Sequence, residues 1–87
     1  MLLVKNFCKD LENVIRPLGW SLTMATHSIH DAAYRFSFLK PLEDGRIVAY
    51  RKIVPELVYH EIDKGELIDD IISEMKDAEN KRREIPN

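Results

Sequence analysis

The chain has 87 residues, of which 45% are hydrophobic and 32% charged, with a formal net charge of −2. A chain of this length holds one core and buries about 60–65% of its unfolded surface, which leaves little room for a deep enclosed active site. The single cysteine, Cys8, excludes an internal disulfide and favours a reducing compartment, and no apolar run approaches the ~20 residues of a membrane span. Charges at Lys5, Lys9 and Asp10 interrupt the apolar region that a signal peptide needs, so we expect a cytoplasmic protein.

The charges are unevenly distributed along the chain. Residues 1–60 carry eight Lys/Arg and six Asp/Glu, whereas residues 61–87 carry five and nine. The acidic excess therefore lies in the C-terminal segment and a mild basic excess lies before it. Neither part is charged strongly enough to favour a general nucleic-acid binder on charge alone.

The first predicted element is an amphipathic helix that begins near residue 4. Its apolar side chains recur at three- and four-residue steps, which places them on one stripe. The stripe consists of Val4, Phe7, Cys8, Leu11, Val14, Ile15 and Leu18. Pro17 disfavours a helical conformation at the residue before it, and Gly19 readily adopts positive φ, so the helix is expected to end near residues 15–18.

Three segments between Trp20 and Lys52 alternate apolar and polar side chains, and this period of two predicts strands that bury one face. Pro, Asp and Gly within residues 41–45 predict a hairpin turn between the second and third strands. The shared buried face is expected to hold Trp20, Leu22, Met24, Tyr34, Phe36, Phe38, Val48 and Tyr50. The three strands are therefore expected to form an antiparallel meander.

The register follows if Lys40 faces Arg46 across that turn. Phe36 is then opposite Tyr50, and Arg35 is opposite Arg51. The other expected neighbours are Phe38 with Val48, Met24 with Phe36, and Leu22 with Phe38. A slip of one residue would turn every aromatic side chain to solvent.

The last predicted element is a helix capped by Asp63. Glu66 follows at the spacing of a capping box, and Ile62 and Leu67 supply a hydrophobic staple. The buried stripe is expected to hold Leu67, Ile68, Ile71, Ile72 and Met75. The stripe thins beyond it, so the turns from about residue 79 to residue 87 are expected to project or fray. Residues 55–62 are predicted as a connector that forms either an edge strand or a short helical turn.

These elements predict a single α+β domain over residues 1–87, in the order α-β-β-β-α, with two helices packed on one face of a three-stranded antiparallel meander. The core is expected to contain Trp20, Phe36, Phe38, Tyr50, Leu11, Val14, Ile68 and Ile72. His27 and His30 fall in the loop of the first hairpin, where the double-stranded-RNA-binding domain also carries a histidine, and the element order resembles that family. The family has a lysine cluster where this chain's second helix opens with Asp63 and Glu66, so the resemblance is one of topology and would imply an RNA-binding module.

Two groups of residues are of the types that bind a metal or act as a nucleophile. His27, His30 and Asp31 are of the types that bind zinc, but most structural zinc sites need four ligands, so we expect a solvated loop and no metal. Cys8 with His60 as its base would follow the logic of a thiol hydrolase. Because Cys8 lies on an apolar stripe, we expect a packed core thiol, no catalytic residue and no cofactor.

The face of the sheet left uncovered by helices carries the most suggestive residues. We expect it to bind a protein partner through Arg35, Arg51, Leu39, Ile47 and Ser37, because arginines beside exposed aliphatic side chains are typical of protein interfaces. The sequence thus favours a small cytoplasmic protein-interaction module without catalytic activity, such as a phage-type accessory or inhibitor protein, which could also self-associate. Binding could also use the C-terminal helix. The alternatives are a nucleic-acid-binding module and an acidic decoy that mimics nucleic acid.

Overall fold

The computed structural model describes residues 4–84, which form a three-stranded antiparallel sheet with helices on one side. The elements are helix α1 (Lys5–Ile15), the 3₁₀ turn η1 (Arg16–Leu18), strands β1 (Ser21–Ser28), β2 (Ala33–Pro41) and β3 (Ile47–Pro55), and helices α2 (Glu56–Glu61) and α3 (Lys64–Arg83). The strand order is β1-β2-β3. The predicted α+β fold and the meander are confirmed, with a short helix, α2, added to the expected order.

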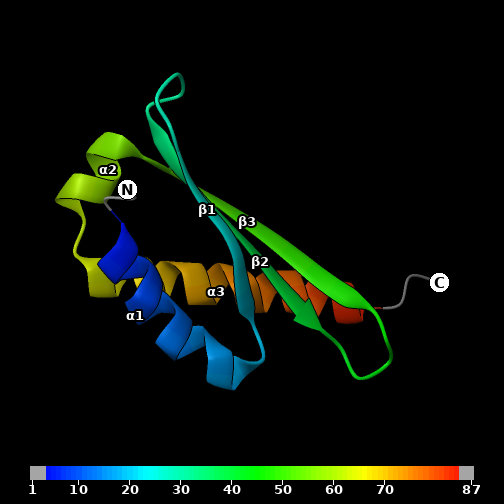
Figure 1. Ribbon diagram of the computed structural model, residues 1–87. Helices are drawn as coiled ribbons and strands as arrows, with labels where there is room; N and C mark the ends of the chain where they lie inside the picture. The colour runs from blue at the N-terminus through cyan, green and yellow to red at the C-terminus, as the bar shows by residue number, and fades with distance from the viewer. Residues whose placement is uncertain (1–3, 85–87) are drawn as a thin grey trace.

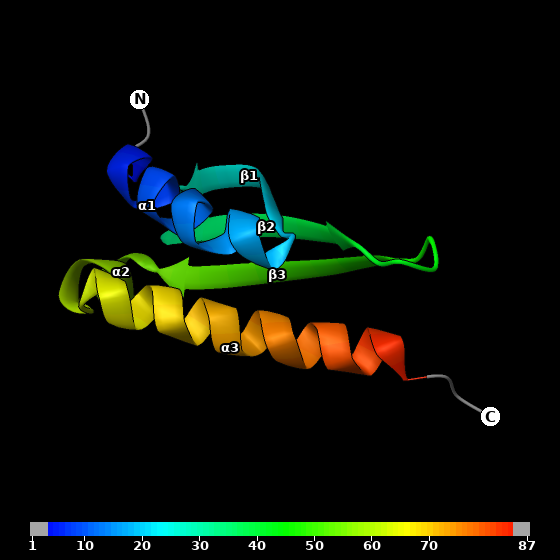
Figure 2. The same cartoon turned by 90° about the horizontal axis from the view of Figure 1, so that it is seen from below.

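The two long helices cover one face of the sheet and leave the other bare (Figure 1). Helix α1 packs beside β1 and helix α3 runs along β3 (Figure 2). The aromatic residues of β2 form the centre of the core, where the Phe36 ring meets the Phe7 ring edge-on at 5.5 Å. The residues that α1 and α3 bury against them are Phe7, Leu11, Ile15, Leu67, Ile71 and Met75.

Four of the eight expected core residues are buried: Trp20, Phe36, Phe38 and Leu11. Tyr50, Ile68 and Ile72 are only partly buried and pack at the margin of the core. Val14 is 42% exposed, so its placement in the core was wrong. Helix α1 touches the sheet along a narrow stripe of residues four apart, and Val14 lies beside this stripe.

The helix ends follow the local signals in the sequence. Gly19 has φ of 87° and closes η1, where its N–H donates to the carbonyl of Arg16 at 2.9 Å. Asp63 caps α3, because its carboxylate accepts from the Glu66 N–H at 3.0 Å. Both ends are confirmed.

Residues 55–62, which were left open between strand and helical turn, form the end of β3 and then α2. Pro55 stands immediately before the helix with φ of −56°, and the Glu56 N–H bonds to the Ala32 carbonyl at 2.8 Å. Ile62 and Asp63 are extended, so α2 and α3 are separate helices.

The register of β2 against β3 differs from the predicted one by two residues. Phe38, not Phe36, is opposite Tyr50, and their rings stack at 5.7 Å. The turn closes around Leu42, whose N–H bonds to the Arg46 carbonyl at 2.8 Å and whose side chain is only 6% exposed. Because the shift is even, every side chain keeps its face.

The register of β1 is right at one end and wrong at the other. Leu22 is opposite Phe38 as expected, but a bulge between Leu22 and Met24 puts Met24 opposite Ser37. The Thr23 hydroxyl donates to the Ser37 carbonyl at 3.1 Å inside the bulge. The inserted residue turns Met24 out of the core and brings Ala25 to the helix side, because one extra residue reverses the alternation.

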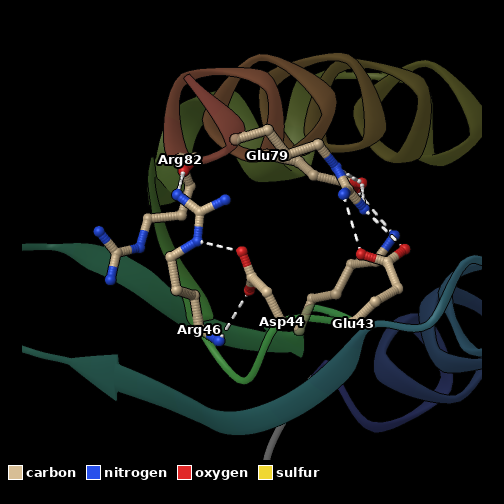
Figure 3. A network of polar contacts seen from close by, with 7 residues as sticks. Glu43, Asp44, Arg46, Glu79 and Arg82 are labelled. Atoms are coloured by element: carbon tan, nitrogen blue, oxygen red, sulfur yellow. Dashed lines mark hydrogen bonds and ion pairs between the residues drawn. The ribbon is translucent and has the colours of Figure 1, made fainter. Parts of the chain in front are cut away.

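Helix α3 continues to Arg83, through turns that were expected to project or fray from about residue 79. A polar network, drawn in Figure 3, joins these turns to the β2–β3 hairpin. Glu79 accepts from Lys40 at 2.8 Å and from Arg83 at 2.9 Å, and Arg83 also donates to Glu43 at 3.0 Å. The end of α3 is thus held at the hairpin, and residues 85–87 of the expected range lie outside the described part of the chain.

Candidate partner-binding surface

The sheet face opposite the helices, called the open face below, exposes large aliphatic side chains. The exposed fractions are 56% for Met24, 39% for Leu39, 56% for Ile47 and 58% for Ile53. Single exposed aliphatic residues are common on protein surfaces, whereas several gathered on one face can mark an interaction site. Four of them on three adjacent strands make this face the strongest candidate for a binding surface.

All five residues expected to bind a partner belong to the open face: Arg35, Arg51, Leu39, Ile47 and Ser37. They are exposed except for Ser37, which is half-buried. Their pairing is not the predicted one, because Arg35 is opposite Ile53 and Arg51 is opposite Ser37. The two guanidinium groups are therefore diagonal neighbours rather than a directly opposed pair, which relieves the like-charge repulsion that the predicted register implied.

A hollow of about 400 Å³ lies between the two arginines. Its lining includes Met24, Thr26 and Ile53. The sequence reasoning missed Met24 because of the bulge, which no local pattern indicates. It missed Ile53 because the third strand was ended at Lys52, although the alternation of Ile47, Ala49, Arg51 and Ile53 continues one step further.

The charge of the open face is positive. Among residues 4–84, the charged strand residues on this face are Arg35 and Arg51. Arg35 pairs with Asp31 in the β1–β2 loop, whereas Arg51 makes no ion pair with any described residue. An unpaired guanidinium next to aliphatic side chains is suited to a carboxylate on a partner, which it can bind through two hydrogen bonds.

The lysines of β2 and β3 belong to the opposite face and are already paired. Lys52 donates to Glu74 of α3 at 2.9 Å, and the Tyr50 hydroxyl donates to the same carboxylate. Burial would raise the pKa of Glu74, but the hydrogen bonds from Lys52 and Tyr50 outweigh it and hold that pKa below its usual value. Burial and the bond to Glu74 raise the pKa of Tyr50.

His27 of β1 is engaged in other contacts, whereas His30 is exposed in the β1–β2 loop. His27 contacts the Glu56 carboxylate through Nε2, and its ring stacks on Tyr34 at 4.6 Å. Asp31 accepts from Ser28 at 3.1 Å and also from Arg35. Within residues 4–84, no group of three His, Cys, Asp or Glu side chains lies close enough to hold a metal ion.

The surroundings of the Cys8 thiol do not activate it as a nucleophile. Cys8 is half-buried between α1 and β1, and burial together with Glu12 raises the pKa of its thiol, which disfavours the nucleophilic thiolate. The His60 ring lies against the rings of Tyr34 and Tyr59. The arrangement therefore does not assemble the activated thiol that a hydrolase would need.

No protein-family model, no curated protein and no solved structure matches this chain. None of the helices in the described part of the chain has the length and apolar character needed to cross a membrane.

Proposed function

We propose that this chain is a protein-interaction module without catalytic activity, which binds its partner through the open face. The observation that carries the proposal is the exposure of Met24, Leu39, Ile47 and Ile53 on the sheet face that the helices leave bare. Burying apolar surface is the main driving force of protein association, at about 25 cal/mol per Å². A cytoplasmic accessory or inhibitor role fits this module.

The partner should combine aliphatic and acidic side chains. The aliphatic part would cover Leu39, Ile47 and Ile53, and a carboxylate would pair with Arg51, which has no ion pair with a described residue. A few residues near the centre of an interface typically supply most of the binding energy, and arginine is enriched among them.

The open face is a better candidate than the end of helix α3. Glu79 and Arg83 are already bonded to Lys40 and Glu43 of the β2–β3 hairpin, so their charges are largely satisfied within the chain. A partner that used them would have to replace these contacts.

The test is capture of partners from the cells of origin with tagged wild-type and variant chains, with and without nuclease. Ile53→Ser and Arg51→Glu alter the open face. Their matched controls, Leu57→Ser on α2 and Lys81→Glu on α3, change exposed residues of the same kinds away from this face.

We expect the two open-face variants to lose a nuclease-resistant partner, with binding about tenfold weaker or more. We expect both controls to retain it. Equal loss in all four variants, or in none, would contradict the proposal. Capture that disappears with nuclease, and binding that falls steeply with salt, would instead support the nucleic-acid alternative through counterion release.

A further inference from the structure

A second surface, which adjoins the open face at Met24, lies at the free edge of β1. A groove of about 850 Å³ runs between helix α1 and this edge. The half-buried residues Cys8, Leu22 and Ala25 line it, together with Lys5, Lys9 and Glu12 of α1. Figure 2 shows α1 lying next to β1, one of the two edge strands of the sheet.

The hydrogen-bond pattern shows which backbone groups of β1 face outward. Bonds from Leu42 N–H to Arg46 and from Glu56 N–H to Ala32 place the even-numbered residues of β2 in bonded pairs with β3. The odd-numbered residues of β2 must then bond to β1, because successive residues of a strand direct their backbone groups to opposite sides. The residues of β1 that face even-numbered partners therefore direct their N–H and C=O groups to the free edge, and these residues are Leu22, Ala25 and His27.

The same residues direct their side chains toward the helices. Leu22 and Ala25 pack at the margin of the core, and His27 stacks on Tyr34. A strand added at this edge would place alternate side chains on the same side, into the groove between α1 and β1. Backbone bonding and side-chain pockets would then act together, as in other cases of strand addition.

The groove is basic on the side of α1. Lys5 and Lys9 lie one helical turn apart and neither makes an ion pair with a residue of the described segment 4–84. Glu12, the acidic residue that lines the groove, is bonded to Arg16 at 2.9 Å. The rim therefore favours a ligand with acidic side chains.

We propose that this groove binds an extended, acidic segment of a partner protein by strand addition to β1. The segment places small aliphatic side chains against Leu22 and Ala25 and a carboxylate near Lys5 and Lys9. The bulge at Thr23 interrupts the edge and limits continuous pairing, so the bound segment is short and bonds on either side of the bulge.

The test begins with selection of binders from a phage-displayed library of random nine-residue peptides on the full chain. The expected result is enrichment of peptides that carry aliphatic and acidic residues at every second position, on the side of the bound strand that faces the groove. When a selected peptide is bound, amide hydrogen exchange at Ala25 and His27 should become slower. Failure to enrich such peptides would overturn the proposal.

Proline substitutions separate edge pairing from other modes of binding. Ala25→Pro removes an outward N–H without removing a bond of the β1–β2 ladder, and its matched control Ala49→Pro does the same on the free edge of β3. We expect the first variant to weaken peptide binding at least about tenfold and the second to leave it unchanged. Equal binding by wild type and folded Ala25→Pro would overturn the proposal.

A second variant keeps the test decisive if Ala25→Pro does not fold. Lys5→Glu with Lys9→Glu changes exposed residues of α1 and should weaken the selected peptides about tenfold or more, with an effect that shrinks in high salt. Arg51→Glu on the open face should not affect them. Peptides that respond to Arg51→Glu and not to the lysine pair would be open-face ligands, and the groove proposal would be wrong.

Discussion

The two faces of the sheet use the same three strands in opposite ways. On the helix side the aromatic residues are buried, and the lysines that emerge there, Lys40 and Lys52, are neutralised by Glu79 and Glu74 of α3. On the open face aliphatic side chains remain exposed, and Arg51 makes no ion pair with a described residue. On the helix side the lysines of β2 and β3 are thus paired within the described part of the chain, whereas the open face has apolar area and positive charge to offer to a partner.

The contrast teaches that alternation alone does not assign a role to a face. Both faces of β3 carry aliphatic residues, with Val48 and Val54 on one and Ile47 and Ile53 on the other. What separates them is the position of α3, which covers one face and supplies carboxylates to it. The variant with the largest expected effect on stability removes a buried side chain from the covered face.

Phe36→Ala should lower the free energy of unfolding by about 3–5 kcal/mol, because it removes a fully buried aromatic side chain and leaves a cavity. Urea unfolding followed by circular dichroism measures this loss. Met24→Ala on the open face is the control and should change stability by less than about 0.5 kcal/mol. Similar urea midpoints for both variants would show that the two faces are not energetically distinct.

Asp63→Ala should lower the free energy of unfolding by about 0.5–2 kcal/mol, because the Glu66 N–H loses its side-chain acceptor at the start of α3. The expected loss of stability is smaller than that of Phe36→Ala, because the buried residues along α3 still hold the helix on the sheet when its cap is removed. Asp69→Ala, an exposed position of the same helix, is the control for the loss of a carboxylate. A midpoint for Asp63→Ala that equals this control would argue against the cap.

Acidification should weaken the attachment of α3 to the sheet. The hydrogen bond from Lys40 holds the pKa of Glu79 below its usual value of 4.5, although burial opposes this shift. A lowered pKa in the folded chain means that the stabilisation is present above about pH 4.5 and is lost as the pH falls through the folded value. Urea midpoints at pH 6 and at lower pH measure it, and Glu79→Gln should lose less on acidification than wild type. An identical pH dependence in both would exclude Glu79 as a contributor.

Ile53→Ser should have the smallest effect on stability, within about 0.5 kcal/mol, because more than half of the side chain is exposed. The same substitution is expected to abolish partner capture, so it separates function from folding. Thermal unfolding checks the first expectation. A large loss of stability would mean that the open face is part of the folded core rather than a surface for a partner.

Local signals in the sequence were sufficient for the end of the first helical segment and for the start of α3. Gly19 ends the first helical segment because glycine adopts a φ of 87° without the strain that a side chain would cause. Asp63 begins α3 because its carboxylate accepts a hydrogen bond from the Glu66 N–H, which has no partner within the helix. The alternation in β2 also identified the buried aromatic residues Phe36 and Phe38. These features depend on neighbours within a few residues.

The sequence also identified the open face, but not its full composition. Arg35 and Arg51 could be assigned to it from the alternation of their strands. Met24 could not, because the bulge that exposes it is a property of the pairing between β1 and β2. Val14 was misplaced for a related reason, since the width of a helix stripe depends on what the helix packs against.

Only the tertiary structure decided the register of the hairpin. A shift of two residues leaves every side chain on its face, so the period of the sequence is equally consistent with Phe36 or Phe38 opposite Tyr50. The choice comes from contacts between distant residues: Leu42 is buried at the turn, Phe38 stacks on Tyr50, and Lys52 reaches Glu74. Local chemistry thus determined the long helices, the three strands and the buried side of β2 and β3, and packing between segments determined the register in which the strands pair.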